Sequence, residues 1–224
     1  MKTVIKPETI RFLKQLKKNN NRDWFNSNKN IYLSAHENFL YFTQALINGI
    51  STFDRSVVGL EPKKCVFRIY RDTRFSKDKS PYKTNFGASI NSGGNKTGTG
   101  GYYLHISPEG SLLASGAYRP MPNELLAIRQ EISSNGDEFK KIINTKTFKK
   151  NFSEISADKL SSAPKGFDKN DPMIEYIKLK SFVMMHDLDE KTVLSSNFVN
   201  YCVKIFKTMI PFNKFISEPL SELK

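Results

Sequence analysis

The chain has 224 residues, 38% of them hydrophobic, and a formal net charge of +13 at pH 7. Seventeen Phe and nine Tyr exclude a disordered chain, and without a Gly/Ser- or Pro-rich linker we expect a single domain over residues 1–224. No segment reaches the ~18 apolar residues of a membrane span, so we expect a cytoplasmic protein without membrane association. Two cysteines and three histidines without a Cys-x-x-Cys predict no metal site.

The N-terminal fifth of the chain has the apolar spacing of helices. Pro7 suits the first position of a helix, where its missing N–H needs no partner, and apolar residues follow at helical spacing. The asparagines at 19–21 predict a stop and then a cap for a second helix, in which Trp24 and Phe25 are expected in the core. Beyond Ser27 a long amphipathic helix is expected, with an apolar stripe of Ile31, Phe39, Phe42, Leu46 and Ile50.

From Cys65 the apolar period changes to two, which is typical of a strand. Cys65, Phe67 and Ile69 are expected on one face, and Val66, Arg68 and Tyr70 on the other. A polar loop over 72–82 follows, and further strands are predicted at 86–90, 102–107 and 111–118. The glycine-rich connection over 91–101 lacks a P-loop ending, so it indicates a hairpin loop rather than a phosphate cradle. Connections of hairpin length predict an antiparallel meander.

The C-terminal half is expected to be mainly helical. Helices are predicted over 123–134, 138–143 and from Pro172 through Ile177, with a fifth strand at 182–185. Ser195 or Ser196 is expected to cap a last long helix, whose buried positions are Phe198, Cys202, Ile205, Phe206 and Met209. The prediction is an α+β fold, with an antiparallel meander sheet of about four to five strands packed with N- and C-terminal helices.

The densest group of charged side chains lies between Glu61 and Lys83. Eight basic and three acidic residues give this window +5 of the chain's +13. Because arginine presents a planar fork of donors that matches phosphate or carboxylate, the window predicts an anion-binding site. The candidate anion-binding residues are Arg68, Arg71, Arg74, Lys79, Tyr82, Lys83, Asn85 and Tyr103. The alternative is a structural ion-pair network in which the arginines bind Asp72, Asp78 and carboxylates of the helices.

Two residues are candidates for acid–base chemistry. Asp72 lies between Arg71 and Arg74, where it either orients an arginine or acts as the nearby carboxylate. His105 shares a strand face with Tyr103 and would lie near Arg68 if both strands present their polar faces to the same side. The alternative for a single histidine in a strand is an ordinary surface residue.

One long pattern resembles the hallmark of the uncharacterised bacterial conserved-hypothetical family known as domain of unknown function 2461: Arg68-x-x-Arg71-Asp72-x-Arg74-Phe75-x-x-x-Lys79-x-Pro81-Tyr82-x-x-Asn85. The resemblance extends to Asn20-x-Arg22-x-Trp24-Phe25, Tyr102-Tyr103-x-His105 and Pro164-Lys-Gly166. It implies a family of about this length, and it brings no assigned activity, cofactor or catalytic residue.

Three functions of different classes fit these residues. The favoured one is an anion-binding protein, as an enzyme acting on a phosphorylated or nucleotide-like substrate through the basic loop. The second is a non-catalytic nucleic-acid-binding protein with Tyr103 and Phe75 as stacking groups. The third is a scaffold or partner-binding module, in which the loop only fixes the fold and Arg71→Ala unfolds the protein. The cofactor and the oligomeric state are not predicted.

Overall fold

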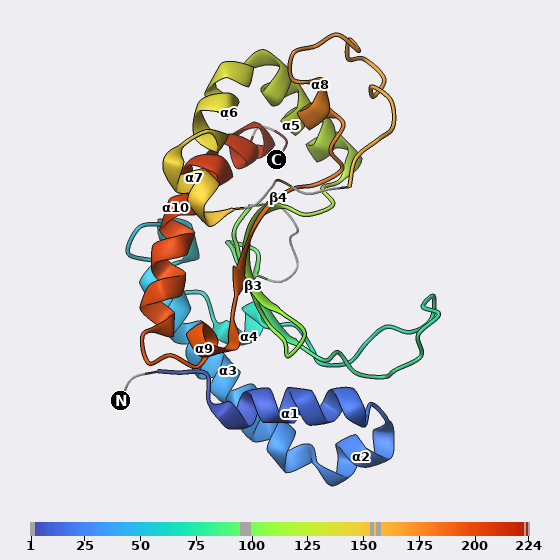
Figure 1. The fold of residues 1–224 in the computed structure, drawn as a ribbon, viewed down its shortest axis with the longest axis vertical. Coiled ribbons are helices and arrows are strands. Elements are labelled where there is room, and N and C mark those ends of the chain that lie inside the picture. Colours follow the sequence, from blue (N-terminus) through green and yellow to red (C-terminus); the bar gives the residue numbers. More distant parts are fainter. Residues whose placement is uncertain (1–2, 95–99, 153–154, 156–157, 222, 224) are drawn as a thin grey trace. The chain divides into compact units, whose positions relative to one another are not determined.

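The computed structural model describes residues 3–94, 100–152, 155, 158–221 and 223 (Figure 1). Its contacts group the chain into two compact units. The first unit comprises Met1–Asn95, Tyr103–Leu113 and Asp187–Lys204. The second comprises Lys96–Tyr102, Ala114–His186 and Ile205–Lys224. Whether the chain behaves as one domain stays a prediction.

Four strands form one antiparallel sheet in the order β1-β2-β3-β4. They are β1 (Phe86–Ile90), β2 (Tyr102–Ile106), β3 (Ser111–Ala117) and β4 (Phe182–Leu188). The α+β fold and the meander from β1 to β3 are therefore confirmed, and β4 is three residues longer than predicted. Residues 95–99 of the glycine-rich connection lie outside the described residues.

The first unit contains the N-terminal helices at the predicted places. They are α1 (Pro7–Lys18), α2 (Arg22–Ser27) and α3 (Lys29–Ile50), followed by the 3-10 turn η1 (Arg55–Val57) and by α4 (Pro62–Cys65). Asn21 caps α2 as predicted, because its side chain accepts a hydrogen bond from the backbone N–H of Trp24 at 2.9 Å. Ile31 was wrongly placed on the apolar stripe of α3, since it is 45% exposed.

Phenylalanines from α1, α3 and β1 form the centre of the first unit. Phe39 of α3 and Phe12 of α1 both stack on Phe86 of β1, with ring centroids 5.3 and 6.2 Å apart. Phe42 stacks on Phe198 at 5.0 Å. All five rings are fully buried, and burying each contributes about 1.5–3 kcal/mol relative to exposure. This core supports one face of the sheet and leaves the opposite face for polar side chains.

The strand predicted from Cys65 is not present. Cys65 ends α4, whose first position is occupied by Pro62. The following residues form isolated bridges rather than a ladder, namely Val66↔Ala88 and Tyr70↔Tyr82, together with a hydrogen bond from the Phe67 N–H to the Gly87 carbonyl at 2.9 Å. The two predicted faces are consequently wrong, because Val66 is buried together with Cys65.

The second unit contains α5 (Pro122–Ser134), α6 (Gly136–Ile143), α7 (Lys146–Asn151) and α8 (Ile174–Ile177). The prediction missed α7, and Leu126 of α5 is 45% exposed. Phe139 lies at the centre of this unit, 5.1 Å from Tyr176 and 5.3 Å from Phe215 between ring centroids. The short α9 (Glu190–Val193) belongs to the first unit, and α10 (Phe198–Ser221) contributes residues to both. None of the described helices has the length and apolarity that crossing a membrane requires.

Candidate functional site

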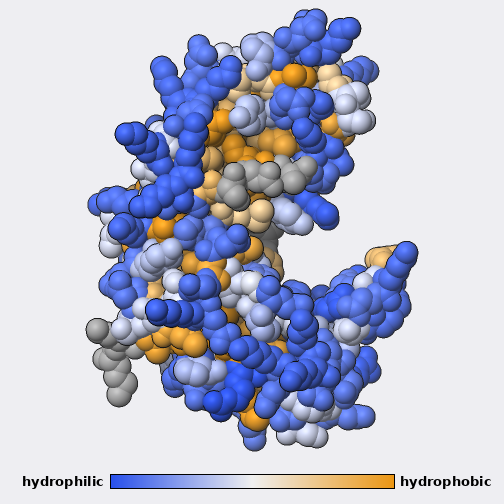
Figure 2. Space-filling model, in the orientation of Figure 1, coloured by the Kyte–Doolittle hydropathy of each residue, from blue (hydrophilic) through white to orange (hydrophobic). Residues whose placement is uncertain are grey.

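Residues 68–85, here called the arm, leave the sheet just before β1 without forming a helix or strand (Figure 1). Near its base the two halves of the arm pair through the isolated bridge Tyr70↔Tyr82 and through a hydrogen bond from the Arg71 N–H to the Pro81 carbonyl at 2.9 Å. Figure 2 shows a largely hydrophilic surface over the arm. This agrees with its composition of six basic and two acidic side chains between residues 68 and 83.

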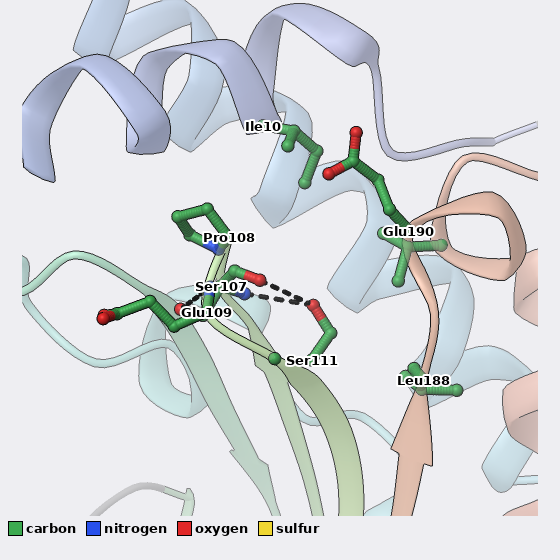
Figure 3. Close-up of a pocket in the computed structure, with 9 residues that line it drawn as sticks. Ile10, Ser107, Pro108, Glu109, Ser111, Leu188 and Glu190 are labelled. Atoms are coloured by element: carbon green, nitrogen blue, oxygen red, sulfur yellow. Dashed lines mark hydrogen bonds between the residues drawn. The ribbon is translucent and has the colours of Figure 1, made fainter.

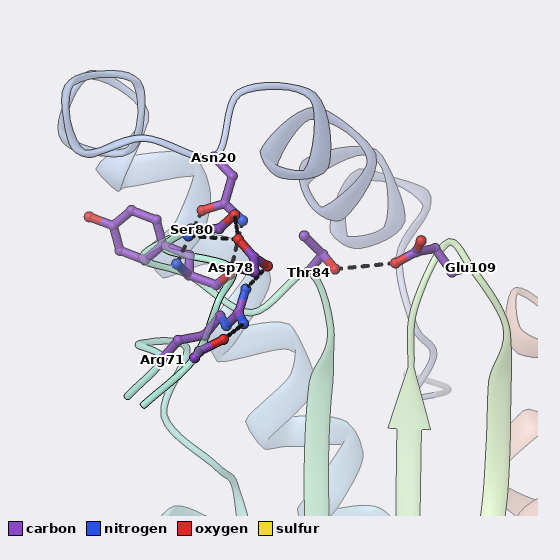
Figure 4. A network of polar contacts seen from close by, with 8 residues as sticks. Asn20, Arg71, Asp78, Ser80, Thr84 and Glu109 are labelled. Carbon is purple, nitrogen blue, oxygen red and sulfur yellow. Dashed lines mark hydrogen bonds and ion pairs between the residues drawn. The ribbon is translucent and has the colours of Figure 1, made fainter. Parts of the chain in front are cut away.

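Asn20, in the turn between α1 and α2, fixes the base of the arm (Figure 4). Its side-chain Nδ2 donates to the Tyr82 carbonyl at 2.9 Å, and its Oδ1 accepts from the Tyr82 N–H at 3.1 Å. The Tyr82 ring is buried and stacks on Phe25 at 4.0 Å. Tyr82 therefore belongs to the core, and its main contacts with the rest of the unit are made by its ring and backbone.

Arg71 binds Asp78 across the arm. Its guanidinium forms an ion pair with the Asp78 carboxylate and donates to Ser76 Oγ at 3.3 Å. Asp78 also accepts from the backbone N–H and the hydroxyl of Ser80, and these donors, with Arg71, hold the pKa of its carboxyl well below the usual range. The Asp78 side chain is 59% exposed, so the pair organises the loop while water screens its contribution to stability.

Arg74 and Lys79 are also engaged within the arm. Arg74 forms a two-pronged ion pair with Asp72, with Nε to Oδ1 at 3.0 Å and Nη2 to Oδ2 at 2.7 Å. This pairing lowers the pKa of the Asp72 carboxyl and makes it a weaker base. Lys79 Nζ donates to the Thr73 carbonyl at 3.0 Å. The alternative of a structural ion-pair network thus describes Arg71 and Arg74, and Asp72 is committed to an arginine.

Arg68 and Lys83 differ from these arginines, because neither forms an ion pair with an acid among the described residues. Arg68 is exposed, and Lys83 is partly buried with its Nζ 5.4 Å from the centroid of the Phe67 ring. Burial, and secondly the charge of Arg68, lower the pKa of the Lys83 amine. The two cations therefore repel each other, and neither forms an ion pair that would offset this repulsion, although the charge of Arg68 also acts on the Asp72 carboxylate.

A second group of polar side chains lies beside them on the sheet. Tyr103 Oη is 3.1 Å from Nδ1 of His105, and Asn85 Nδ2 is 3.4 Å from the same nitrogen. Phe67, which lies under Lys83, packs edge-on against Tyr103 with ring centroids 6.2 Å apart. We call Arg68, Lys83, Asn85, Tyr103 and His105 together the polar patch.

Gly87 of β1 provides the space for Tyr103. A Cβ at this position would lie 2.8 Å from Tyr103 Oη and 3.3 Å from Cε2, closer than side chains tolerate. The absence of a side chain at residue 87 thus allows the Tyr103 hydroxyl to lie over β1 within reach of His105. This requirement could not be predicted from the sequence, because a single glycine in a strand has several explanations.

His105 is held as a neutral imidazole. Burial lowers its pKa, and two donor groups facing Nδ1 favour the tautomer in which Nδ1 accepts and Nε2 carries the proton. A neutral ring whose remaining nitrogen is a donor can hydrogen-bond an anionic oxygen or transfer a proton. Of the two predicted acid–base candidates, His105 has the more suitable surroundings.

A small pocket of about 170 Å³ lies elsewhere in the first unit, between α1, the β2–β3 turn and α9 (Figure 3). Its two carboxylates already bind lysines of α1, Glu190 to Lys14 and Glu109 to Lys17. The turn serines bond with each other, since Ser111 Oγ donates to the Ser107 carbonyl at 3.2 Å. The polar groups that line the pocket already bind one another or neighbouring lysines, so fewer of them are available to a ligand than in the polar patch.

Of the predicted anion-binding residues, the structure brings Arg68, Lys83, Asn85 and Tyr103 together with His105. It engages Arg71, Arg74 and Lys79 inside the arm and places Tyr82 in the core. Sequence reasoning did not assign Asn20 as the anchor of the arm or Phe67 as the ring beneath Lys83. Among the described residues, no three His, Cys, Asp or Glu side chains gather as a metal-ligand set.

The comparisons with known proteins give one match. A family model described as a conserved hypothetical protein (DUF2461) covers residues 8–215. No curated protein and no solved structure matches the chain.

Proposed function

The chain belongs to the DUF2461 family of conserved hypothetical proteins, and we propose that it binds a phosphate-bearing small molecule, such as a nucleotide, at the polar patch. The observation that carries the proposal is that two cations, Arg68 and Lys83, lie near enough for the charge of Arg68 to lower the pKa of Lys83, while neither forms an ion pair with an acid among the described residues. Such a pair is unfavourable alone, since each charge raises the energy of the other. A bound anion would remove the repulsion.

The neutral groups of the patch suit a phosphate equally well. The Asn85 amide and the Nε2–H of His105 supply N–H donors, and phosphate oxygens accept several hydrogen bonds at once; the Tyr103 hydroxyl faces His105 Nδ1 and holds the ring in place. The Phe67 and Tyr103 rings add apolar surface that shields the cations partly from water, which strengthens their attraction for an anion. The patch thus combines charge, neutral donors and aromatic surface within one part of the first unit.

The arm contributes to the proposed site as a support. The Asn20 anchor, the Tyr82–Phe25 stack and the Arg71–Asp78 pair restrain the chain on either side of Arg68 and Lys83. Restraining these side chains before binding reduces the entropy lost when a ligand orders them. If the protein is an enzyme, His105 is the residue we assign to proton transfer, because Asp72 is neutralised by Arg74.

A thermal-shift screen at low ionic strength tests the proposal. The ligands are inorganic phosphate, pyrophosphate, mononucleotides, phosphosugars and dicarboxylates, each against the wild type and Arg68→Gln. A ligand at 100 times its Kd adds about 2.7 kcal/mol, and therefore about 5–10 °C for a chain of this size. The proposal expects such a shift with at least one phosphate compound and its loss in Arg68→Gln. No shift with any of them, or an equal shift in the variant, would contradict it.

A further inference from the structure

The geometry points to a larger ligand for this surface: we propose that the arm binds single-stranded nucleic acid, with one base stacked on Phe75 and neighbouring phosphates on the arm's cations. The inference rests on the proposed function, because Arg68 and Lys83 of the polar patch supply two of those cations.

The exposure of the Phe75 ring is the first observation that supports this proposal. Phe75 is 95% exposed, the highest value among the exposed large apolar side chains of the described residues, whereas Phe12, Phe25, Phe39 and many other phenylalanines are fully buried. The Arg74 guanidinium lies over the Phe75 ring, 5.8 Å from its centroid, and no other aromatic ring among the described residues packs against it. A ring held at this exposure presents both a flat apolar face and an adjacent positive charge.

A continuous series of charged groups leads from the polar patch to Phe75. The charge of Arg68 acts on Lys83 and also on Asp72. Asp72 holds Arg74 by two hydrogen bonds, and Arg74 lies against the Phe75 ring. Basic residues without an ion pair to a described acid accompany the series, namely Arg68, Lys77, Lys79 and Lys83. Phosphates spaced along a strand would meet these four cations, whereas the Asp72–Arg74 pair beside the ring carries no net charge.

The combination favours a single strand over a duplex or a protein. Bases in a duplex are already stacked on their neighbours, so only an unpaired base offers its face to Phe75. A protein pocket that accepted the Phe75 ring would also have to accommodate the charges of Arg74 and Lys77. The arm is restrained at its base by Asn20, so binding a flexible strand need not first order the protein side.

Fluorescence anisotropy with a labelled 12-nucleotide single strand of mixed sequence tests the inference. The proteins are the full-length wild type, Phe75→Ala and a control, Tyr41→Ala, which removes a 65% exposed aromatic ring from α3 in the same unit. We expect Phe75→Ala to weaken binding roughly 5- to 150-fold, the range for loss of one base–aromatic stack, and Tyr41→Ala to leave it unchanged. A matching duplex should bind more weakly than the single strand, and affinity should fall with salt at a log–log slope of about −2 to −3 for three or four phosphate contacts.

A parallel titration with pyrophosphate separates this inference from the proposed function. Phe75→Ala should bind pyrophosphate as the wild type does. If the wild type binds pyrophosphate but Phe75→Ala binds the single strand as tightly as the wild type, the stacking inference is overturned and the proposed function stands. Equal affinity for duplex, single strand and a poly-glutamate peptide would also overturn it, because charge alone would then explain binding. If neither pyrophosphate nor the strand binds at low salt, both proposals fail.

Discussion

Replacing Asn20 with alanine removes the side chain that ties the arm to the turn between α1 and α2. The amide makes two hydrogen bonds to the backbone of Tyr82, at 2.9 and 3.1 Å, and both bonds are partly buried. Each bond contributes about 0.5–1.5 kcal/mol net, so we expect the first unit to lose about 1–3 kcal/mol of stability. Because Lys83 follows Tyr82 directly, the same change should weaken anion binding at the polar patch.

Urea denaturation followed by tryptophan fluorescence measures this loss. Trp24 is the only tryptophan of the chain, and its ring lies in the first unit, 6.3 Å from Phe12. For an m value near 2 kcal/mol/M, the expected loss moves the midpoint down by about 0.5–1.5 M. The control is Asn26→Ala, which truncates an exposed asparagine of α2. Equal midpoints for Asn20→Ala, Asn26→Ala and the wild type would refute the idea that Asn20 anchors the arm.

Three further predictions concern the polar patch and the arm. Gly87→Ala should displace the Tyr103 ring, because the new Cβ would lie 2.8 Å from Tyr103 Oη, and NMR should then show changed His105 ring shifts; unchanged shifts would mean that Tyr103 does not depend on this space. The pKa of His105 should lie below the ordinary histidine value of about 6.5, because burial disfavours the charged ring. The neutral ring's contribution to stability is therefore present above a pH of about 6.5 and is lost as the pH falls from there through the pKa of the folded protein. An NMR titration that gives His105 a pKa at or above the ordinary value of about 6.5 would contradict this prediction. Asp78→Asn should loosen the arm by removing the charge that binds Arg71, so trypsin should cut within the arm faster than in the wild type, and an equal cleavage rate would argue against the ion pair as an organiser.

Much of the fold was predictable because local chemistry decides it. Pro7 begins α1, Asn21 caps α2, and the strand at 86–90 has the predicted bounds, each from signals that act within a few residues. The strand predicted from Cys65 is absent because such local signals do not show whether a partner strand is available. The alternation of apolar residues is local, whereas a ladder needs a regular partner. Pro81 in the returning half of the arm has no N–H to donate, and only isolated bridges form.

The sequence indicated which residue types gather in the arm, but it did not indicate how they pair. Which cation binds which acid depends on how the loop turns, and whether the arm is an anion-binding site stays a prediction. Arg71 reaches Asp78, seven residues away, and Asn20 reaches Tyr82 across 62 residues. Neither contact has a periodic signal. Exposure also could not be inferred, and it matters here: the Arg71–Asp78 pair is 26% and 59% exposed, so it is not the buried pair on which the third hypothesis relied.

Isothermal titration with pyrophosphate at low ionic strength measures whether Arg68 and Lys83 form an anion site. The comparison is between Arg68→Gln/Lys83→Gln and a control with the same change in net charge, Arg11→Gln/Lys18→Gln, which replaces two exposed cations of α1. Hydrogen bonds to charged groups contribute about 1.5–3 kcal/mol each, so we expect saturable binding in the wild type and the control, and a loss of affinity of at least about tenfold in Arg68→Gln/Lys83→Gln. Equal affinity in the two double variants would show that general positive charge, rather than this pair of side chains, attracts the anion.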